Sequence, residues 1–427
     1  MILRVDRVLF LFPTIWDRHQ LEACAPAWTG RYEIAFGEPD DMSCSWDFDV
    51  LAYVEEVAAR ERGRIRGVTS SSDYPGATAA GAVATRLGLP GTPPERVIGC
   101  SHKYYARLAQ REVAPEAVPE FHLVHPREPG GGAPGLRFPC FLKPVKGTFS
   151  VMSRRLNDAG ELDEFLSRPA VREFMEGYVA IFNRLVAAYT GFAVNGSYFL
   201  AEGLLHGNQV TVEGFRREGE TVILGVVDSV SHPETGSFLR FDYPSRLPGE
   251  VQARMRELAA RVIGRLGLES TLFNIELTYD AAADRIGIIE VNPRICGQFA
   301  DLYQKVDGTN GYEFALALAT GRDLPGSGRG RFRVAASFPL RVFRPVRAAR
   351  VPDARRVREV EEAIPGTHVW VECEAGQELT DFESLEDGFS FRYAVVNLGA
   401  ESLEVLEERL REVEERLGFA FEDVRVP

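Results

Sequence analysis

The sequence predicts an α/β protein, α+β in parts, with more than one domain. Strand-like apolar runs alternate with helical spacing over the first hundred residues, and two longer strands form a hairpin after residue 270. Alternation of this kind favours a parallel sheet covered by helices. At about 150 residues per domain, the 427 residues indicate roughly three domains.

The first hundred residues form the expected parallel unit. Strands are expected at 8–12, 33–36 and 65–69, and helices at 50–62 and 77–87. A dinucleotide-binding unit would have a glycine-rich turn after its first strand. Here the turn is Pro13-Thr14-Ile15-Trp16-Asp17, which argues against a redox enzyme of that type.

The remaining chain mixes strands and helices. A helix at 102–112 precedes strands at 121–124, 141–143 and 149–152, and two further helices are expected before residue 196. Strands and helices then alternate to about residue 322. Short strands follow, and the leucine spacing at 403–417 predicts an amphipathic helix packed on a sheet.

Composition excludes several classes of function. The net charge of -13 argues against a nucleic-acid surface, which needs clustered Lys and Arg. No run approaches the roughly 20 apolar residues of a membrane span, and the N-terminus lacks the apolar run of a signal peptide. The six cysteines form no CxxC pair. We therefore expect free thiols and a cytoplasmic protein.

Lysine is scarce in this chain. Only four of the 49 Lys and Arg residues are Lys, namely Lys103, Lys143, Lys146 and Lys305. Lys and Arg are not interchangeable where a compact ammonium must contact phosphate. The first three lie in motifs described below, whereas Lys305 is expected to be a surface lysine.

The hairpin after residue 270 carries an acidic pair. Folding it about Ala283 sets Glu276 nearly opposite Glu290, and Asn292 shares a strand face with Glu290. Like charges opposite each other destabilise a sheet, and a bound cation would compensate. Oxygen ligands of this kind suit Mg²⁺. Spacing alone is equally compatible with a solvated polar strand face.

At this hairpin the sequence resembles the ATP-grasp superfamily. The run Glu290-Val-Asn-Pro-Arg294, with Glu276 on the neighbouring strand, is similar to that family's magnesium site. The resemblance implies that Glu276, Glu290 and Asn292 hold Mg²⁺, with Mn²⁺ as an alternative. It implies that Arg294 is catalytic and stabilises charge on the transferred phosphoryl group.

Further motifs resemble the ATP site of that family. Ser101-His102-Lys103, with Arg107 one turn later, and the strand that carries Lys143 are similar to segments whose lysines contact ATP phosphates. Lys146 to Ser150 resembles the loop that covers the phosphates, with the single glycine Gly147 where relatives are often richer. The implied ATP-binding residues are Lys103, Lys143, Lys146, Ser150, Glu202, Leu205 and Gln209.

Three of these residues resemble the hinge that binds the nucleoside. Glu202 would face the adenine amino group, the backbone at Leu205 would pair with the ring, and Gln209 would lie near the ribose. Gln209 stands where a carboxylate is common in the family.

The resemblance also implies a domain order. An N-terminal parallel-sheet domain would occupy residues 1–100, a lid subdomain with its connecting helix 101–196, the catalytic core 197–330, and a small C-terminal α/β subdomain 331–427. The last segment resembles the amino-acid ligase and biotin-carboxylase-like branch.

The activity implied is that of an ATP- and Mg²⁺-dependent ligase. It would join a small carboxylate, an amino acid or a related compound, to an amine through an acyl phosphate, releasing ADP. Two alternatives stay open: an enzyme that activates bicarbonate, and a catalytically silent nucleotide-binding module. The expected partners are small molecules, with no nucleic acid and no membrane, and a homodimer is left open.

Overall fold

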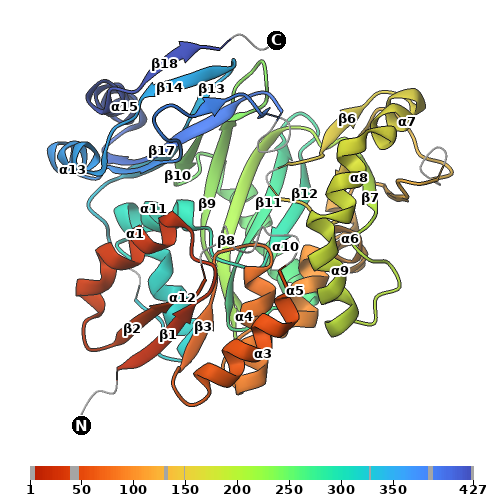
Figure 1. The fold of residues 1–427 in the computed structure, drawn as a ribbon, viewed down its shortest axis with the longest axis horizontal. Coiled ribbons are helices and arrows are strands. Elements are labelled where there is room, and N and C mark those ends of the chain that lie inside the picture. Colours follow the sequence, from red (N-terminus) through yellow and green to blue (C-terminus); the bar gives the residue numbers. More distant parts are fainter. Residues whose placement is uncertain are drawn as a thin grey trace.

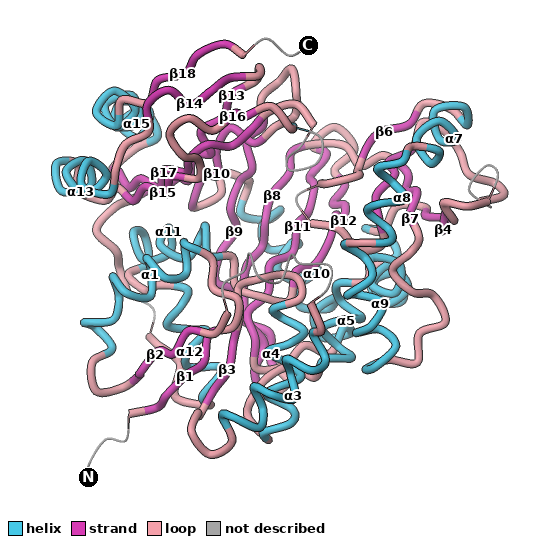
Figure 2. The backbone as a smooth tube through the Cα atoms, in the orientation of Figure 1, coloured by secondary structure: helices cyan, strands magenta, loops and turns pink. Residues whose placement is uncertain are grey.

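Four sheets organise the part of the chain that the computed structural model describes, which comprises residues 5–38, 48–128, 133–148, 150–326, 328–382 and 388–424. Figure 1 shows the largest of them in the middle of the molecule, with the N-terminal unit below it, the C-terminal elements above and a smaller unit of strands and helices at the right. Figure 2 shows its long strands running between helical layers.

The N-terminal unit is the parallel sheet expected from the sequence, with strand order β2-β1-β3. Its strands are β1 (Asp6–Phe10), β2 (Tyr32–Phe36) and β3 (Gly67–Thr69), and its helices are α1 (Ile15–Cys24), η1 (Ala25–Trp28), α3 (Val50–Glu61) and α4 (Gly76–Leu87). Val8 and Phe10 pack into one core and Leu9 into another. Burial on both faces explains the continuous apolar run of this strand.

A second group of elements corresponds to the predicted lid and its supports, and it keeps the name lid below. The helices are α5 (Pro94–Ser101), α6 (Lys103–Val113), η2 (Pro115–Ala117), α7 (Ala159–Ser167), α8 (Pro169–Glu176) and α9 (Tyr178–Tyr189). The strands β4 (Phe121–Val124), β5 (Cys140–Pro144), β6 (Arg154–Leu156) and β7 (Phe199–Gly203) form a sheet in the order β4-β7-β5-β6. This sheet includes β7, which lies beyond residue 196.

Two sequence-based expectations for this region are wrong. The strand expected at 149–152 is a turn over its described residues, because Ser150 and Met152 have φ values of 60° and 58°, which an extended strand excludes. Phe149 lies outside the described residues. Three helices follow rather than two, since Pro169 starts α8 after an extended Arg168.

The central sheet is antiparallel and has the strand order β12-β11-β8-β9-β10-β13-β17-β15. Its strands are β8 (Asn208–Arg217), β9 (Glu220–Ser231), β10 (Phe238–Tyr243), β11 (Thr271–Asp280), β12 (Arg285–Asn292), β13 (Val334–Val342), β15 (His368–Val371) and β17 (Phe391–Ala400). Three of these strands come from residues after 330. The C-terminal segment therefore extends the central sheet as well as forming structure of its own.

The remaining elements surround this sheet. The helices are α10 (Gly249–Leu266), α11 (Gly297–Asp307), α12 (Gly311–Thr320), α13 (Ala354–Ala363) and α15 (Leu403–Leu417). A small sheet contains β16 (Glu378–Leu379), β14 (Val346–Arg350) and β18 (Ala420–Asp423). The helix expected at 403–417 is confirmed, and its buried Leu406 and Val413 pack in the core that includes β17.

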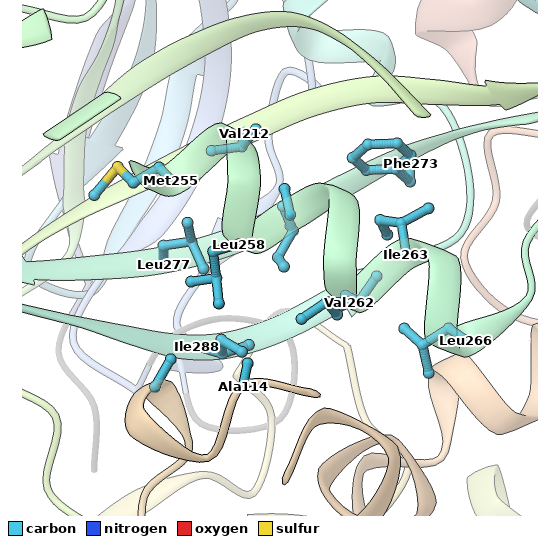
Figure 3. Close-up of a cluster of buried hydrophobic side chains, with 14 of the residues drawn as sticks. Ala114, Val212, Met255, Leu258, Val262, Ile263, Leu266, Phe273, Leu277 and Ile288 are labelled. Atoms are coloured by element: carbon cyan, nitrogen blue, oxygen red, sulfur yellow. The ribbon is translucent and has the colours of Figure 1, made fainter. Parts of the chain in front are cut away.

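Helix α10 covers one face of the central sheet, which leaves the opposite face available for a functional site. Its apolar residues recur at helical spacing and pack against apolar side chains of β8, β11 and β12. Figure 3 shows Met255, Leu258 and Val262 of α10 beside Leu277 and Ile288 of the strands. Because strand side chains alternate, the neighbouring polar residues of these strands point to the opposite face.

Several expectations from composition can be compared with the structure. The five described cysteines are free thiols, and Cys44 lies outside the described residues. In the described ranges, no helix combines the length and apolar character needed to cross a bilayer. Lys305 is not the surface residue we expected, because it lies buried on α11 and forms an ion pair with Asp301 one turn earlier.

Candidate functional site

The acidic hairpin has the register that the sequence predicted. Glu276 lies opposite Glu290 and Asn274 opposite Asn292. Nδ2 of Asn292 donates to Oε1 of Glu276 at 3.3 Å, and Nε2 of Gln209 donates to Oε2 of Glu276 at 2.9 Å. Two amide side chains therefore donate to the carboxylate of Glu276.

A β-bulge shapes the second strand. The register shifts next to the Glu276–Glu290 pair, so Ile289 has no partner on β11. A bulge leaves backbone groups outside the ladder of hydrogen bonds. The carbonyl of Ile289 instead accepts from Nζ of Lys143 at 3.2 Å and from Nη2 of Arg107 at 2.8 Å. The backbone carbonyl at the bulge thus holds two cationic side chains beside the acidic pair.

Glu202 is surrounded by the same two cations. Its Oε1 accepts from Nε of Arg107 at 2.6 Å, and its Oε2 accepts from Nη2 of Arg107 at 3.1 Å and lies 2.8 Å from Nζ of Lys143. Burial alone would raise the pKa of Glu202, but Arg107 and Lys143 outweigh it and lower the pKa to about 2. The carboxylate is ionised and fully engaged by side chains of the chain itself.

The pKa values of the two opposed carboxylates, Glu276 and Glu290, are shifted in opposite directions. Burial, and then the charge of Glu290, raise the pKa of Glu276 to about 8. Burial would also raise the pKa of Glu290, but Lys103 and Lys143 outweigh it and lower the pKa. Lys103 reaches Oε2 of Glu290 at 3.2 Å and donates to the carbonyl of Gly147 at 3.0 Å.

Asp73 connects the N-terminal unit to this cluster. It follows β3, and its Oδ2 accepts from Nζ of Lys146 at 2.9 Å while its Oδ1 lies 4.0 Å from Nε of Arg294. Burial would raise the pKa of Asp73, but Lys146 and then Arg294 outweigh it and lower the pKa to about 2. Nζ of Lys146 also lies 5.1 Å from the ring centroid of Tyr74.

Two candidates lie away from these contacts. Leu205 lies in the connection between β7 and β8. Its side chain is close to Gly287 of the hairpin, so a Cβ atom added at Gly287 would lie 2.7 Å from Cδ2 of Leu205. Ser150 is exposed in the turn that follows Thr148. In the ranges that the structure describes, no side-chain hydrogen bond joins Ser150 to the other candidates.

The sequence reasoning missed three residues of this cluster. Asp73 stands at the carboxyl end of a parallel strand, where ligands gather in open α/β sheets, so its position was a usable signal. Arg107 was noted in its motif, but its contact with Glu202 was not foreseen. Glu213 accepts from Nδ2 of Asn274 at 3.0 Å, and burial raises its pKa to about 7. No local pattern marks Glu213.

A pocket opens among these groups. Its polar lining includes Asp73, Lys103, Arg107, Lys146, Glu290 and Asn292. Cations from α6 and the lid thus face carboxylates from the hairpin. This combination suits a polyanion such as a nucleoside triphosphate together with a divalent cation.

Comparisons with known proteins agree with the fold. Residues 136–301 match the family model described as the ATP-grasp domain. These residues contain β5, the hairpin and ten of the eleven candidate residues, and only Lys103 precedes them. The expected ATP-grasp fold is confirmed.

Solved structures with this fold span nearly the whole chain. An L-amino acid ligase from Bacillus licheniformis has a TM-score of 0.74 at 18% identity, covering 98% of this chain and 100% of its own. N5-carboxyaminoimidazole synthase from Aspergillus clavatus, in complex with ADP, has a TM-score of 0.66 at 12% identity, covering 97% and 99%. Biotin carboxylase from Campylobacter jejuni has a TM-score of 0.64 at 12% identity, covering 99% and 93%. No curated protein sequence matches the chain.

Proposed function

We propose that this chain, which has the ATP-grasp fold, is an ATP- and Mg²⁺-dependent ligase that joins a small carboxylate to an amine through an acyl phosphate. The observation that carries the proposal is the direct pairing of Glu276 with Glu290 beside Lys103 and Lys143. A solvated strand face would not be expected to gather the buried Lys143 and the partly buried Lys103 around two opposed carboxylates.

The residues fit a magnesium ion. Two opposed carboxylates repel each other, and the raised pKa of Glu276 expresses that repulsion together with burial. Glu276, Glu290 and the amide oxygen of Asn292 would hold Mg²⁺, or Mn²⁺ in its place, with phosphate oxygens and water as further ligands. When bound, the ion supplies charge neutralisation at the transferring phosphoryl group.

Three lysines would bind the phosphates of ATP. Each is already paired with a carboxylate: Lys103 with Glu290, Lys143 with Glu202, and Lys146 with Asp73. Phosphate binding would add acceptors to ammonium groups that the fold already positions. Positioning and charge neutralisation carry most of the catalysis in phosphoryl transfer.

Arg294 would orient the reacting carboxylate and the γ-phosphoryl group. Its side chain is mostly buried and lies 4.0 Å from Asp73, with donors available for a planar anion. The substrate carboxylate oxygen attacks the γ-phosphorus, and ADP leaves. The amine then attacks the acyl carbon, orthophosphate leaves, and the amine loses a proton as the amide forms.

The L-amino acid ligase neighbour supports amino acids as the first substrates to try, because its TM-score of 0.74 exceeds that of the biotin carboxylase neighbour. The bicarbonate-activating alternative is supported by the biotin carboxylase neighbour at a lower TM-score. The two alternatives differ in the carboxyl donor, so one assay can separate them.

The test offers amino acids singly and in pairs to the purified chain with ATP and Mg²⁺. We expect ADP and orthophosphate, one carboxylate ¹⁸O atom transferred into the phosphate, and a hydroxamate when hydroxylamine replaces the amine. Release of AMP, or phosphate without the label, would refute the acyl phosphate. Turnover that requires bicarbonate would instead indicate the carboxylating alternative, and absence of turnover with every donor would favour the silent module.

A further inference from the structure

Three side chains from distant segments converge away from the pocket. His19 lies on α1, Glu361 on α13 and His368 at the start of β15, and one potential ligand atom of each lies within 4.8 Å of the other two. Imidazole nitrogen and carboxylate oxygen are common ligands of zinc and related metals. In Figure 1, α1 and α13 lie on the same side of the molecule, beside α11.

The separations are close to those of a bound ion. Nδ1 of His368 lies 3.9 Å from Oε1 of Glu361. Two ligands at about 2.0–2.1 Å from a tetrahedral zinc ion lie ~3.3 Å apart. The His368–Glu361 pair would have to close by about half an ångström, and a pair at the 4.8 Å limit by about 1.5 Å, to reach that geometry.

A second observation supports a metal at this place. The other ring nitrogen of His368, Nε2, faces Oδ2 of Asp301 at 3.9 Å. A histidine that binds a metal generally directs its second ring nitrogen to a carboxylate or carbonyl, which fixes the ring. Asp301 is buried and held by contacts with Lys305 and Asn397. Its carboxylate is thus fixed behind His368.

The local charges and packing also suit a cation. Asp301 and Glu361 contribute two negative charges and Lys305 one positive charge near His368. Trp370 lies beside both histidines, with ring centroids 6.3 Å from His19 and 6.1 Å from His368. Apolar side chains around a metal site limit the access of water to it.

We propose that His19, Glu361 and His368 bind a divalent transition metal of the Zn²⁺ type, which links the N-terminal unit to the C-terminal segment. Three protein ligands leave at least one position for water. The site does not depend on the proposed ligase activity. Because α1 and α13 are more than 300 residues apart in sequence, the metal would stabilise the folded chain by joining them.

The test uses the full chain without a histidine tag, stripped with a chelator and kept in excess Mg²⁺ so that the acidic hairpin is occupied. Zn²⁺ is titrated by calorimetry, and the melting temperature is measured with and without Zn²⁺. We expect one Zn²⁺ per chain and a higher melting temperature. His19→Ala, His368→Ala and Glu361→Gln should each weaken Zn²⁺ binding at least about tenfold.

Two matched variants serve as controls. Glu362→Gln changes the exposed neighbour of Glu361, and His125→Ala removes a histidine of the lid, so both should bind Zn²⁺ like the wild type. Co²⁺ should quench the fluorescence of the wild type through Trp370, and His19→Ala should abolish that quenching. Equal Zn²⁺ affinity in the ligand variants and the wild type would overturn the proposal.

A crystallographic measurement covers the case in which a ligand variant fails to fold. Anomalous diffraction at the zinc edge from wild-type crystals grown with Zn²⁺ should place a peak among His19, Glu361 and His368. A peak found at Glu276 and Glu290 alone would overturn the proposal.

Discussion

Glu276 and Glu290 lie opposite each other on β11 and β12, yet their pKa values move in opposite directions. Burial, and then the charge of Glu290, raise the pKa of Glu276 to about 8. Partial burial of Glu290 would raise its pKa too, but Lys103 and Lys143 outweigh this effect and lower the pKa. Without a bound cation, one member of the pair therefore holds a proton at neutral pH while the other is ionised.

This asymmetry predicts that Mg²⁺ binding releases a proton. The pKa of Glu276 rises from 4.5 to about 8 on folding, so its protonated form stabilises the metal-free fold at low pH, and that stability is lost as pH rises toward 8. Mg²⁺ needs the ionised form, so its affinity should increase over the same range. Calorimetry in buffers of different ionisation enthalpy would measure the released proton, which Glu276→Gln should eliminate. Equal release from both proteins would contradict the assignment.

The partner carboxylate should be needed for turnover. Glu290→Gln keeps the shape but removes an anionic ligand and the partner of Lys103. We expect a loss in kcat of about 100-fold or more with Mg²⁺, since charge neutralisation dominates phosphoryl transfer. Steady-state assays of ADP release would measure it, with Glu250→Gln, a change at an exposed residue of α10, as the control. A folded Glu290→Gln protein with near-normal rates would disprove the metal site.

The register of the hairpin could be predicted because strand alternation and a short turn leave few alternatives. The pairing of Glu276 with Glu290 followed from that geometry alone. Lysine scarcity also directed attention to Lys143 and Lys146, which lie buried and ion-paired. The same argument did not reveal that Lys305 is buried, because its partner Asp301 lies in a helix with no recognisable motif.

Other features depend on tertiary contacts and could not be read from local patterns. The bulge at Ile289 is one extra residue in a strand, and no periodicity distinguishes it from a regular residue. The apolar side chains near Ser150 suggested a strand, whereas its φ of 60° belongs to a turn. Asp73 lies about 200 residues before the hairpin, so only the assembled fold brings it to Arg294.

The scarcity of lysine leads to a prediction for Lys143. Its ammonium lies between Glu202 and the carbonyl of Ile289, in a buried region that already contains Arg107. Arg at this position adds volume and donors, and overpacking costs about 1–3 kcal/mol. Lys143→Arg should therefore weaken ATP binding about tenfold or more, measured by calorimetry with a non-hydrolysable analogue.

A reverse exchange on the surface is the control for this variant. Arg355, whose side chain is 81% exposed, should tolerate replacement by Lys without loss of stability or ATP affinity. If Lys143→Arg binds ATP normally while Lys143→Ala does not, charge alone suffices at this position. The argument from lysine scarcity would then be wrong.

The ion pairs of Glu202 predict a pH-dependent contribution to stability. Its pKa falls from 4.5 to about 2 in the folded chain, so the stabilisation is present above pH 4.5 and is lost as pH falls toward 2. Glu202→Gln leaves Arg107 and Lys143 buried without their counter-ion, which costs about 3–5 kcal/mol. Urea unfolding near neutral pH should show this loss, and the difference from the wild type should shrink as the pH is lowered below 4.5.

Glu116→Gln, which removes an exposed ion pair with Arg261, is the control and should cost no more than about 1 kcal/mol of unfolding free energy. If the effect of Glu202→Gln were the same at every pH, it would arise from packing rather than from the ion pairs.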